Sequence, residues 1–216
     1  MNLRRVSQLA VAIGAFFTFT TLAFAGPPLI CHAIDIGGAK TLPWVDLNYH
    51  KGDHGYDLRN LTADTLAILD SNAPVLVRME TLRRATIYAR QDPIVAKELI
   101  TRLQARAVSR TENALADFDF GYLVETYKAW IGGTEPNPAR TLDGYAWVTR
   151  AIRARGGDAE MEFAAALITL SGPQDAHSEH VQKATAGAKS DPLLARNLAS
   201  EFRNQTISAL LTEPVK

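Results

Sequence analysis

The sequence contains very little cysteine, because Cys31 is the only thiol among 216 residues. This count excludes an intramolecular disulfide, so the fold depends on a hydrophobic core, which a chain of this length can build. A c-type haem is excluded too, since its motif needs a second cysteine where Pro28 stands. We expect Cys31 to be a small buried residue or an inert thiol, because His32 would point to the opposite side of an extended segment.

The chain also lacks a net charge of either sign, with 23 basic and 23 acidic residues. Without Arg4 and Arg5, which belong to the leader described below, 21 basic residues remain against 23 acidic ones. Such a balance produces no broad field that attracts nucleic acid or an anionic membrane surface. We therefore expect no nucleic-acid partner. The hydrophobic share of 47% excludes wholesale disorder.

Familiar catalytic motifs are missing as well. The sequence has no phosphate-binding loop, Gly-rich dinucleotide turn, Gly-x-Ser-x-Gly elbow or His-Glu-x-x-His pair. Gly37-Gly38-Ala39-Lys40 is similar to a fragment of a phosphate loop, but it lacks the first glycine and the following Ser or Thr. These absences favour a non-catalytic role without a cofactor.

Residues 1–25 have the three parts of a secretory signal peptide. Arg4 and Arg5 precede an apolar run from Val11 to Phe24, and the segment closes on Ala23-Phe24-Ala25. We expect cleavage after Ala25 and export of the mature chain to a periplasmic or extracellular location. The run is short for a membrane span, so no stable membrane insertion is expected after cleavage.

The mature chain divides into an N-terminal arm, residues 26–60, and a helical domain, residues 61–216. The arm is rich in Gly, Pro, Asp and His and shows no helical period, which predicts an extended segment. We expect Leu42 and Trp44 to hold it against the helices and Gly37-Gly38 to turn it. From Asp64 onward the pattern predicts helix almost throughout, and after residue 60 no run alternates with the period of two that marks a strand.

Helix boundaries in the second part follow from caps and stops. An apolar face predicts a helix over about 75–90, with Glu80 and Arg84 paired on its surface. Asp residues at helix starts predict further helices, since a carboxylate there accepts orphan backbone N–H groups. Helices with such starts begin at about 93, 159, 175 and 192. Another helix is predicted over about 112–131 with a break near Gly121, and a stripe of Val148, Ala151 and Ile152 predicts one that ends at Gly156-Gly157.

Three segments repeat one pattern, in which a basic residue and Ala are followed by Asp eight positions after the basic residue. The three aspartates, Asp92, Asp158 and Asp191, lie 66 and 33 residues apart. This unit and period resemble helical-hairpin repeats of the tetratricopeptide or HEAT kind over residues 75–210. The resemblance implies an all-α fold of antiparallel hairpins stacked as a short solenoid. An irregular bundle of hairpins would produce the same pattern.

The densest group of metal-ligand residue types lies in the arm. His50, Asp53 and His54 fall within five residues, and a loop there could wrap a cation. Gly52 and Gly55 argue against a helical His-x3-His pair, and the alternative to a metal-binding loop is a solvated polar loop. On a predicted helix further on, His177 and His180 share a face, but two ligands make no zinc site, and a partly buried helix surface is favoured.

Aromatic residues concentrate in two short stretches on either side of a loop. Phe118, Tyr122 and Trp130 fall near one helical face, and Tyr145 and Trp147 follow the loop. They line either a concave groove for a peptide or apolar ligand, or simply the core. The sequence therefore predicts an exported interaction scaffold or adaptor whose partner is another protein or peptide. The alternative is a metal-dependent hydrolase or metal-binding protein that uses the His50/His54 loop.

Overall fold

The computed structural model of the protein describes residues 28–45, 52–109, 113–129, 137–172 and 174–202. Within these ranges every regular element is helical and no strand occurs, so the all-α prediction is confirmed. The predicted signal peptide lies outside the described residues, as do His50 and Trp130.

The helices follow one another with short connections. A single helical turn, α1, lies within the arm, where the sequence predicted extended chain only, and the rest of the arm up to residue 45 turns at Gly37-Gly38. A 3-10 turn at Leu58–Asn60 leads directly into α2. The elements are α1 (Pro28–Cys31), α2 (Leu61–Asp70), α3 (Val75–Ala89), α4 (Pro93–Ser109), α5 (Ala114–Ala129), α6 (Gly144–Ala154), α7 (Ala159–Ile168), α8 (Gln174–Ala188) and α9 (Pro192–Glu201).

The three repeated aspartates cap helices as predicted. Asp92 accepts hydrogen bonds from the amides of Ile94 and Val95 at the start of α4. Asp158 and Asp191 accept from the equivalent amides at the starts of α7 and α9. Each carboxylate thereby satisfies N–H groups that have no partner inside the helix.

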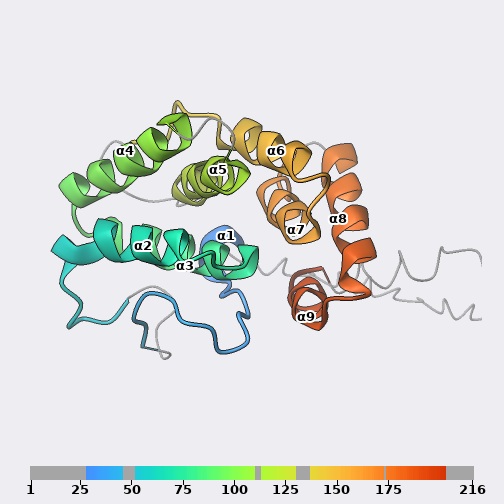
Figure 1. Ribbon diagram of the computed structural model, residues 1–216, viewed down its shortest axis with the longest axis horizontal. Helices are drawn as coiled ribbons and strands as arrows, with labels where there is room; N and C mark the ends of the chain where they lie inside the picture. The colour runs from blue at the N-terminus through green and yellow to red at the C-terminus, as the bar shows by residue number, and fades with distance from the viewer. Residues whose placement is uncertain (1–27, 46–51, 110–112, 130–136, 173, 203–216) are drawn as a thin grey trace, which may run out of the picture.

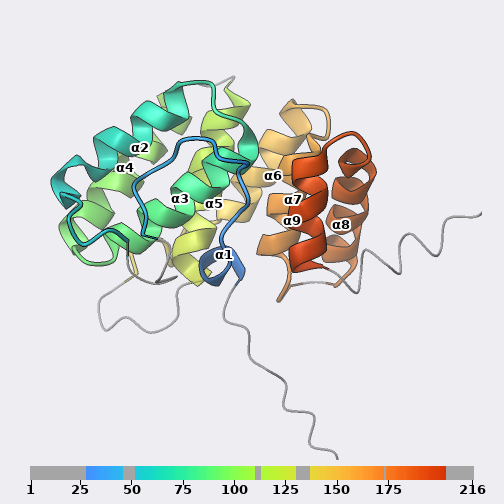
Figure 2. The ribbon, with the colours of Figure 1, turned by 90° about the horizontal axis from the view of Figure 1, so that it is seen from below.

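The helices form two neighbouring groups. Figure 1 shows α2 to α5 on one side and α6 to α9 on the other, with α5 beside α6 at the junction. The arm crosses the face of α3 in Figure 2. Helix α3 is buried almost throughout, since it lies between the arm and α5. No helix in the described ranges combines the length and apolar character that crossing a membrane requires.

Side chains of α3 bind the backbone of the arm. Glu80 accepts a hydrogen bond from the Ile34 amide at 3.0 Å, and Arg84 donates to the Leu42 carbonyl at 2.7 Å. Tyr88 donates to the Pro43 carbonyl at 2.5 Å. Leu42 is buried, and the Trp44 ring packs edge-on against Tyr88. The structure thus confirms that Leu42 and Trp44 hold the arm.

The predicted pair of Glu80 and Arg84 exists, but it does not lie on the surface. Glu80 is completely buried, and its carboxylate accepts from both Arg83 and Arg84. The predicted exposure of the pair was wrong, because an i,i+4 pair has the same sequence pattern whether or not another segment of the chain covers it. Here the arm covers the pair, through hydrogen bonds between residues that lie more than forty positions apart in the sequence.

Helix α5 continues through Gly121 without the break that the sequence predicted. The glycine serves close packing instead, because a Cβ at Gly121 would lie 2.6 Å from the Gly144 carbonyl oxygen. A Cβ at Gly144 would lie 2.4 Å from the Gly121 carbonyl oxygen. The two glycines therefore let the backbones of α5 and α6 touch, which places Trp147 of α6 against Phe120 of α5.

Candidate functional site

The five aromatic residues predicted to line one face do not all lie together. Phe118 and Tyr122 are fully buried and stack on each other, with ring centroids 5.6 Å apart. They therefore belong to the core, the other reading of their pattern. Trp130 lies outside the described residues, whereas Tyr145 and Trp147 are partly exposed on α6.

Trp147 lines a groove between α4, α5 and α6. The groove has a volume of about 500 Å³, which falls within the range of small-ligand and peptide pockets. Its apolar surface comes from Ala107, Val108, Ala114, Trp147 and Ala154. Val108 is 59% exposed, so its side chain adds accessible apolar surface. Short side chains on both walls leave room for an apolar group from another molecule.

The polar edge of the groove is rigid. Arg150 donates two hydrogen bonds to the Asp117 carboxylate, at 2.6 and 2.5 Å. Its guanidinium carbon also lies 3.9 Å from the centroid of the Trp147 ring, which packs edge-on against Phe120. The hydrogen bonds to Asp117 raise the pKa of Arg150, so the guanidinium stays charged. Bidentate pairing and stacking together fix the orientation of both side chains.

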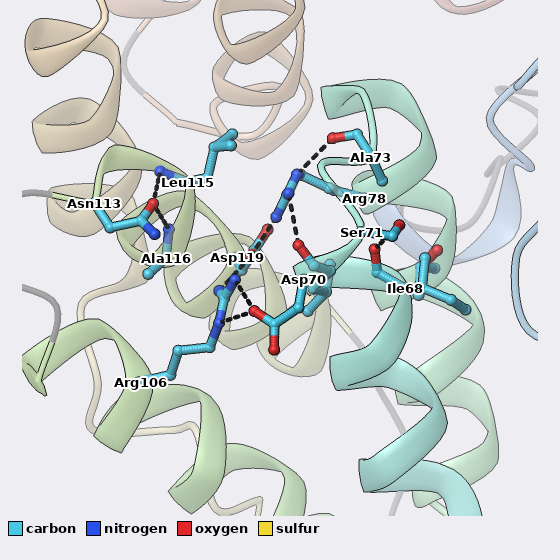
Figure 3. A network of polar contacts seen from close by, with 12 residues as sticks. Ile68, Asp70, Ser71, Ala73, Arg78, Arg106, Asn113, Leu115, Ala116 and Asp119 are labelled. Carbon is cyan, nitrogen blue, oxygen red and sulfur yellow. Dashed lines mark hydrogen bonds and ion pairs between the residues drawn. The ribbon is translucent and has the colours of Figure 1, made fainter.

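A buried ion network holds the α4 wall of the groove in place. Figure 3 shows Asp119 of α5 between Arg78 of α3 and Arg106 of α4, each donating to Asp119 at 2.7 Å. Arg106 also binds Asp70 at the end of α2. Burial raises the pKa of Asp119, and the two guanidinium groups oppose that shift. The groove wall is thereby tied to three other helices.

The charges around the groove are mainly positive on the α6 side. Helix α6 contains no acidic residue, and both of its arginines, Arg150 and Arg153, are exposed. Asp117 is the acid in the groove lining, and Arg150 already pairs with it. A ligand with both apolar and acidic groups therefore matches the surface better than a basic one.

A hydrogen-bonded chain of three side chains lies on the other face of α6. The Tyr145 hydroxyl lies 2.7 Å from His180 Nε2, and His180 Nδ1 lies 2.5 Å from a carboxylate oxygen of Glu162. Tyr145 comes from α6, Glu162 from α7 and His180 from α8. Sequence reasoning took His180 for a partly buried helix residue and did not connect it with the other two. A histidine beside the apolar stripe of its helix was the available signal, since a buried imidazole needs partners.

The predicted metal loop is only partly within the described residues. Asp53 accepts a hydrogen bond from the Gly55 amide at 2.8 Å, and His54 is exposed. In the parts of the chain that the structure covers, no three His, Cys, Asp or Glu side chains are grouped closely enough to hold a metal ion. The arrangement of Asp53 is that of a local turn, in which the side chain binds its own backbone.

Cys31 and His32 do not act on each other. His32 pairs with Glu201 of α9, with 2.6 Å between Nδ1 and the carboxylate oxygen. Cys31 is partly exposed, and burial raises the pKa of its thiol while nearby Arg83 opposes the shift. A thiol with a raised pKa is a weaker nucleophile at neutral pH, which agrees with an inert role.

A second hollow, of about 540 Å³, lies where the N-terminal ends of α3, α7 and α9 meet. Glu160 accepts a hydrogen bond there from the Leu76 amide at 3.1 Å. Asp158 and Asp191, which also line it, are already engaged as helix caps. The carboxylates therefore serve the helix ends, and Glu160 ties α7 to α3.

Comparisons with models of protein families, with curated proteins and with solved structures find no match to this chain. Function is therefore inferred from the geometry of its own residues. Of the two features on α6, the groove offers an open apolar surface with a fixed charge. The Tyr145–His180–Glu162 chain offers a polar surface group with a base behind it.

Proposed function

We propose that the protein is a non-cytoplasmic binding module whose α4/α5/α6 groove holds a peptide segment of a partner protein. The observation that carries the proposal is the groove itself, an apolar hollow of about 500 Å³ edged by the fixed Trp147–Arg150 pair. Tryptophan and arginine are the residue types that most often dominate the energetics of protein interfaces. The leader pattern in residues 1–25 supports the location.

The chemistry of the groove defines the partner segment. Ala107, Ala114 and Ala154 leave space above an apolar floor, so an aliphatic side chain of the partner would be buried there. Arg150 is about half exposed although it pairs with Asp117, so one side of its guanidinium faces solvent. Exposed Arg153 adds a second positive charge on the same helix. We therefore assign the partner as a segment that combines aliphatic and acidic residues.

A direct test measures binding of a fluorescein-labelled synthetic peptide of alternating leucine and glutamate by fluorescence anisotropy. We expect saturable binding that weakens as salt increases, because part of the attraction is electrostatic. The matched peptide, with lysine in place of glutamate, should bind at least about tenfold more weakly, a difference of about 1.4 kcal/mol. Equal binding of both peptides would refute the assignment of an acidic partner.

A pair of variants then locates the binding surface. Ala154→Phe fills the groove from the end of α6 and should lower affinity for the acidic peptide by at least about tenfold. Ala186→Phe makes the same change at an exposed alanine near the end of α8 and should bind like the wild type. If Ala154→Phe keeps full affinity while its circular dichroism is unchanged, the groove is not the binding site.

A further inference from the structure

The chain of Tyr145, His180 and Glu162 has the connectivity of a nucleophile, a base and a group that orients the base. Three helices supply one member each, and Glu162 is only 2% exposed. The His180 imidazole is also buried and packs edge-on to the Tyr145 ring, with centroids 5.8 Å apart. Tyr145 itself is partly exposed. The chain thus runs from a buried carboxylate to the hydroxyl of a partly exposed tyrosine.

The buried carboxylate determines which nitrogen of His180 carries the proton. A carboxylate accepts hydrogen bonds, so Nδ1 of neutral His180 donates to Glu162 at 2.5 Å. The Nε2 lone pair is then left to accept the hydroxyl proton of Tyr145 at 2.7 Å. This is the tautomer that a general base needs beside a nucleophile.

The phenol needs such a base. Burial raises the pKa of Tyr145, the Glu162 and Glu179 carboxylates raise it further, and Lys183 opposes them. Tyr145 therefore keeps its proton at neutral pH and becomes a nucleophile only if a neighbour removes that proton. The charged groups that face His180 are Glu162 from α7 and the flanking Glu179 and Lys183 on its own helix.

The surrounding charge selects the class of electrophile. Two carboxylates, Glu162 and Glu179, stand against the single cation Lys183, which bonds to Glu179 at 2.6 Å. Phosphoryl transfer depends on several cations to stabilise its anionic transition state, and this site lacks them among the described residues. A neutral carboxylic ester brings no charge of its own into the site, and the single negative charge that develops during acyl transfer is smaller than that of a phosphoryl group.

We propose that Tyr145 is the nucleophile of an esterase activity, with His180 as its general base and Glu162 as the positioning residue. Tyr145 Oη forms a bond to the carbonyl carbon of a neutral ester, and its proton passes to His180 Nε2. The alcohol leaves as the C–O bond breaks and takes that proton. Water then attacks the acyl–tyrosine ester, again giving a proton to Nε2, and the acid is released as Tyr145 recovers its proton. The net reaction converts ester and water to acid and alcohol. It is independent of the groove, so either proposal can fail alone.

The test uses the full mature chain and 4-nitrophenyl acetate. We expect release of nitrophenol and an acetyl group on Tyr145, trapped by acid quenching and located by mass spectrometry of peptides. Tyr145→Phe should abolish that adduct, and His180→Asn should slow its formation by about 100-fold or more. Glu162→Gln, which keeps an acceptor oxygen, should lower the rate of acylation with a smaller change in KM than in kcat.

Tyr56→Phe is the matched control, because Tyr56 is also partly buried but donates to a carboxylate, Asp64, instead of a histidine. It should leave the rate unchanged. The pH profile of the wild type needs no variant: acylation should proceed well below the pH of about 10 at which a free phenol ionises, because a neighbouring base takes the proton as the bond forms. A rate that rises only near pH ~10, or acetyl groups on lysines and Tyr56 but not on Tyr145, would overturn the proposal.

Discussion

Glu80 in the first group of helices and Glu162 in the second are both buried glutamates, but their hydrogen-bond chains end differently. The Glu80 carboxylate is bound by two guanidinium groups and by the Ile34 amide, and those guanidinium groups continue to carbonyls of the arm. Glu162 is bound by one imidazole, which continues to the hydroxyl of the partly exposed Tyr145, and Lys183 lies 3.8 Å from its other oxygen. One chain ends in backbone and the other in a side chain that solvent reaches.

The difference separates a structural network from one suited to chemistry. Backbone carbonyls of the arm can only accept hydrogen bonds, so the Glu80 network can do no more than hold that segment in place. A tyrosine hydroxyl is a donor, an acceptor and a nucleophile, and its proton can move along the chain behind it. Buried charge by itself is therefore a poor guide to function. The chemistry of the group at the end of the hydrogen-bond network is a better guide.

The largest expected change in unfolding free energy comes from a comparison in which each of the two buried glutamates is replaced separately by glutamine. Glu80→Gln leaves Arg83, which is only 1% exposed, without its counter-ion and should cost about 3–5 kcal/mol of unfolding free energy. Glu162→Gln keeps an oxygen for His180 Nδ1 and should cost only about 1 kcal/mol. Urea unfolding followed by circular dichroism measures both values.

Each variant serves as the other's control, since both exchange a buried glutamate for glutamine. Similar losses of unfolding free energy in the two variants would contradict the proposed difference and show that both networks stabilise the fold to the same extent. Unequal m-values would mean that the unfolded states differ, and the free energies could not then be compared directly.

A medium loss of stability is expected from Gly144→Ala, a substitution that should push the second group of helices away from the first. The added Cβ would lie 2.4 Å from the Gly121 carbonyl oxygen, so α6 must shift away from α5. We expect a loss of about 1–3 kcal/mol, as for other overpacked cores. Hydrogen exchange should accelerate in α6, whereas α3 beneath the arm should keep its protection.

Gly55→Ala is the matched control for this substitution. Gly55 is exposed, and its added Cβ would lie at an ordinary distance of 3.4 Å from the Asp53 carboxylate. Its stability should stay within about 0.5 kcal/mol of the wild type. Equal effects of the two alanines would contradict a close contact between α5 and α6.

The smallest effect is expected at Glu160, which joins the two groups of helices through the Leu76 amide. Burial raises the pKa of Glu160, the Leu76 hydrogen bond opposes the shift, and Asp191 and Asp158 raise the pKa further. The folded state therefore binds this proton more tightly than the unfolded state does. The stability it contributes is complete below the unfolded pKa, about 4.3, and is lost as pH rises through the folded pKa.

Glu160→Gln should remove this dependence. At neutral pH the variant should equal or exceed the wild type by less than about 1 kcal/mol, because the partly exposed carboxylate is screened by solvent. The two proteins should become equally stable below pH ~4. Thermal unfolding across pH measures the difference, with Glu98→Gln on the exposed side of α4 as the control. The predicted sign would be wrong if the Glu160→Gln variant were as stable as the wild type at pH ~4 but less stable than the wild type at neutral pH.

Features that depend on nearby residues were predictable from the sequence. The caps at Asp92, Asp158 and Asp191 rest on hydrogen bonds to amides two and three positions away, and all three were found. The turn at Gly37-Gly38 was also predictable, and both glycines adopt positive φ angles of 61° and 84°. In these cases the chemistry and the chain geometry lie within one short segment.

Features that depend on distant segments were predicted only in part. Tyr145 was named as a site residue, but its partners lie 17 and 35 positions further on, in two other helices. Phe118 and Tyr122 showed the same aromatic character as Trp147, yet they lie in the core while Trp147 lines the groove. The resemblance to helical-hairpin repeats and the leader in residues 1–25 stay predictions.

The sequence by itself determined that the chain is helical and where the helices with aspartate caps begin, because capping carboxylates and apolar periods act within a few residues. The tertiary structure alone decided which polar side chains are buried and which of them meet. Arg83 and Arg84 looked alike in sequence, but the arm covers one of them almost completely and leaves the other 18% exposed. The reason is physical: burial and long-range hydrogen bonds depend on which elements pack together, and between α5 and α6 that packing rests on the pair Gly121 and Gly144.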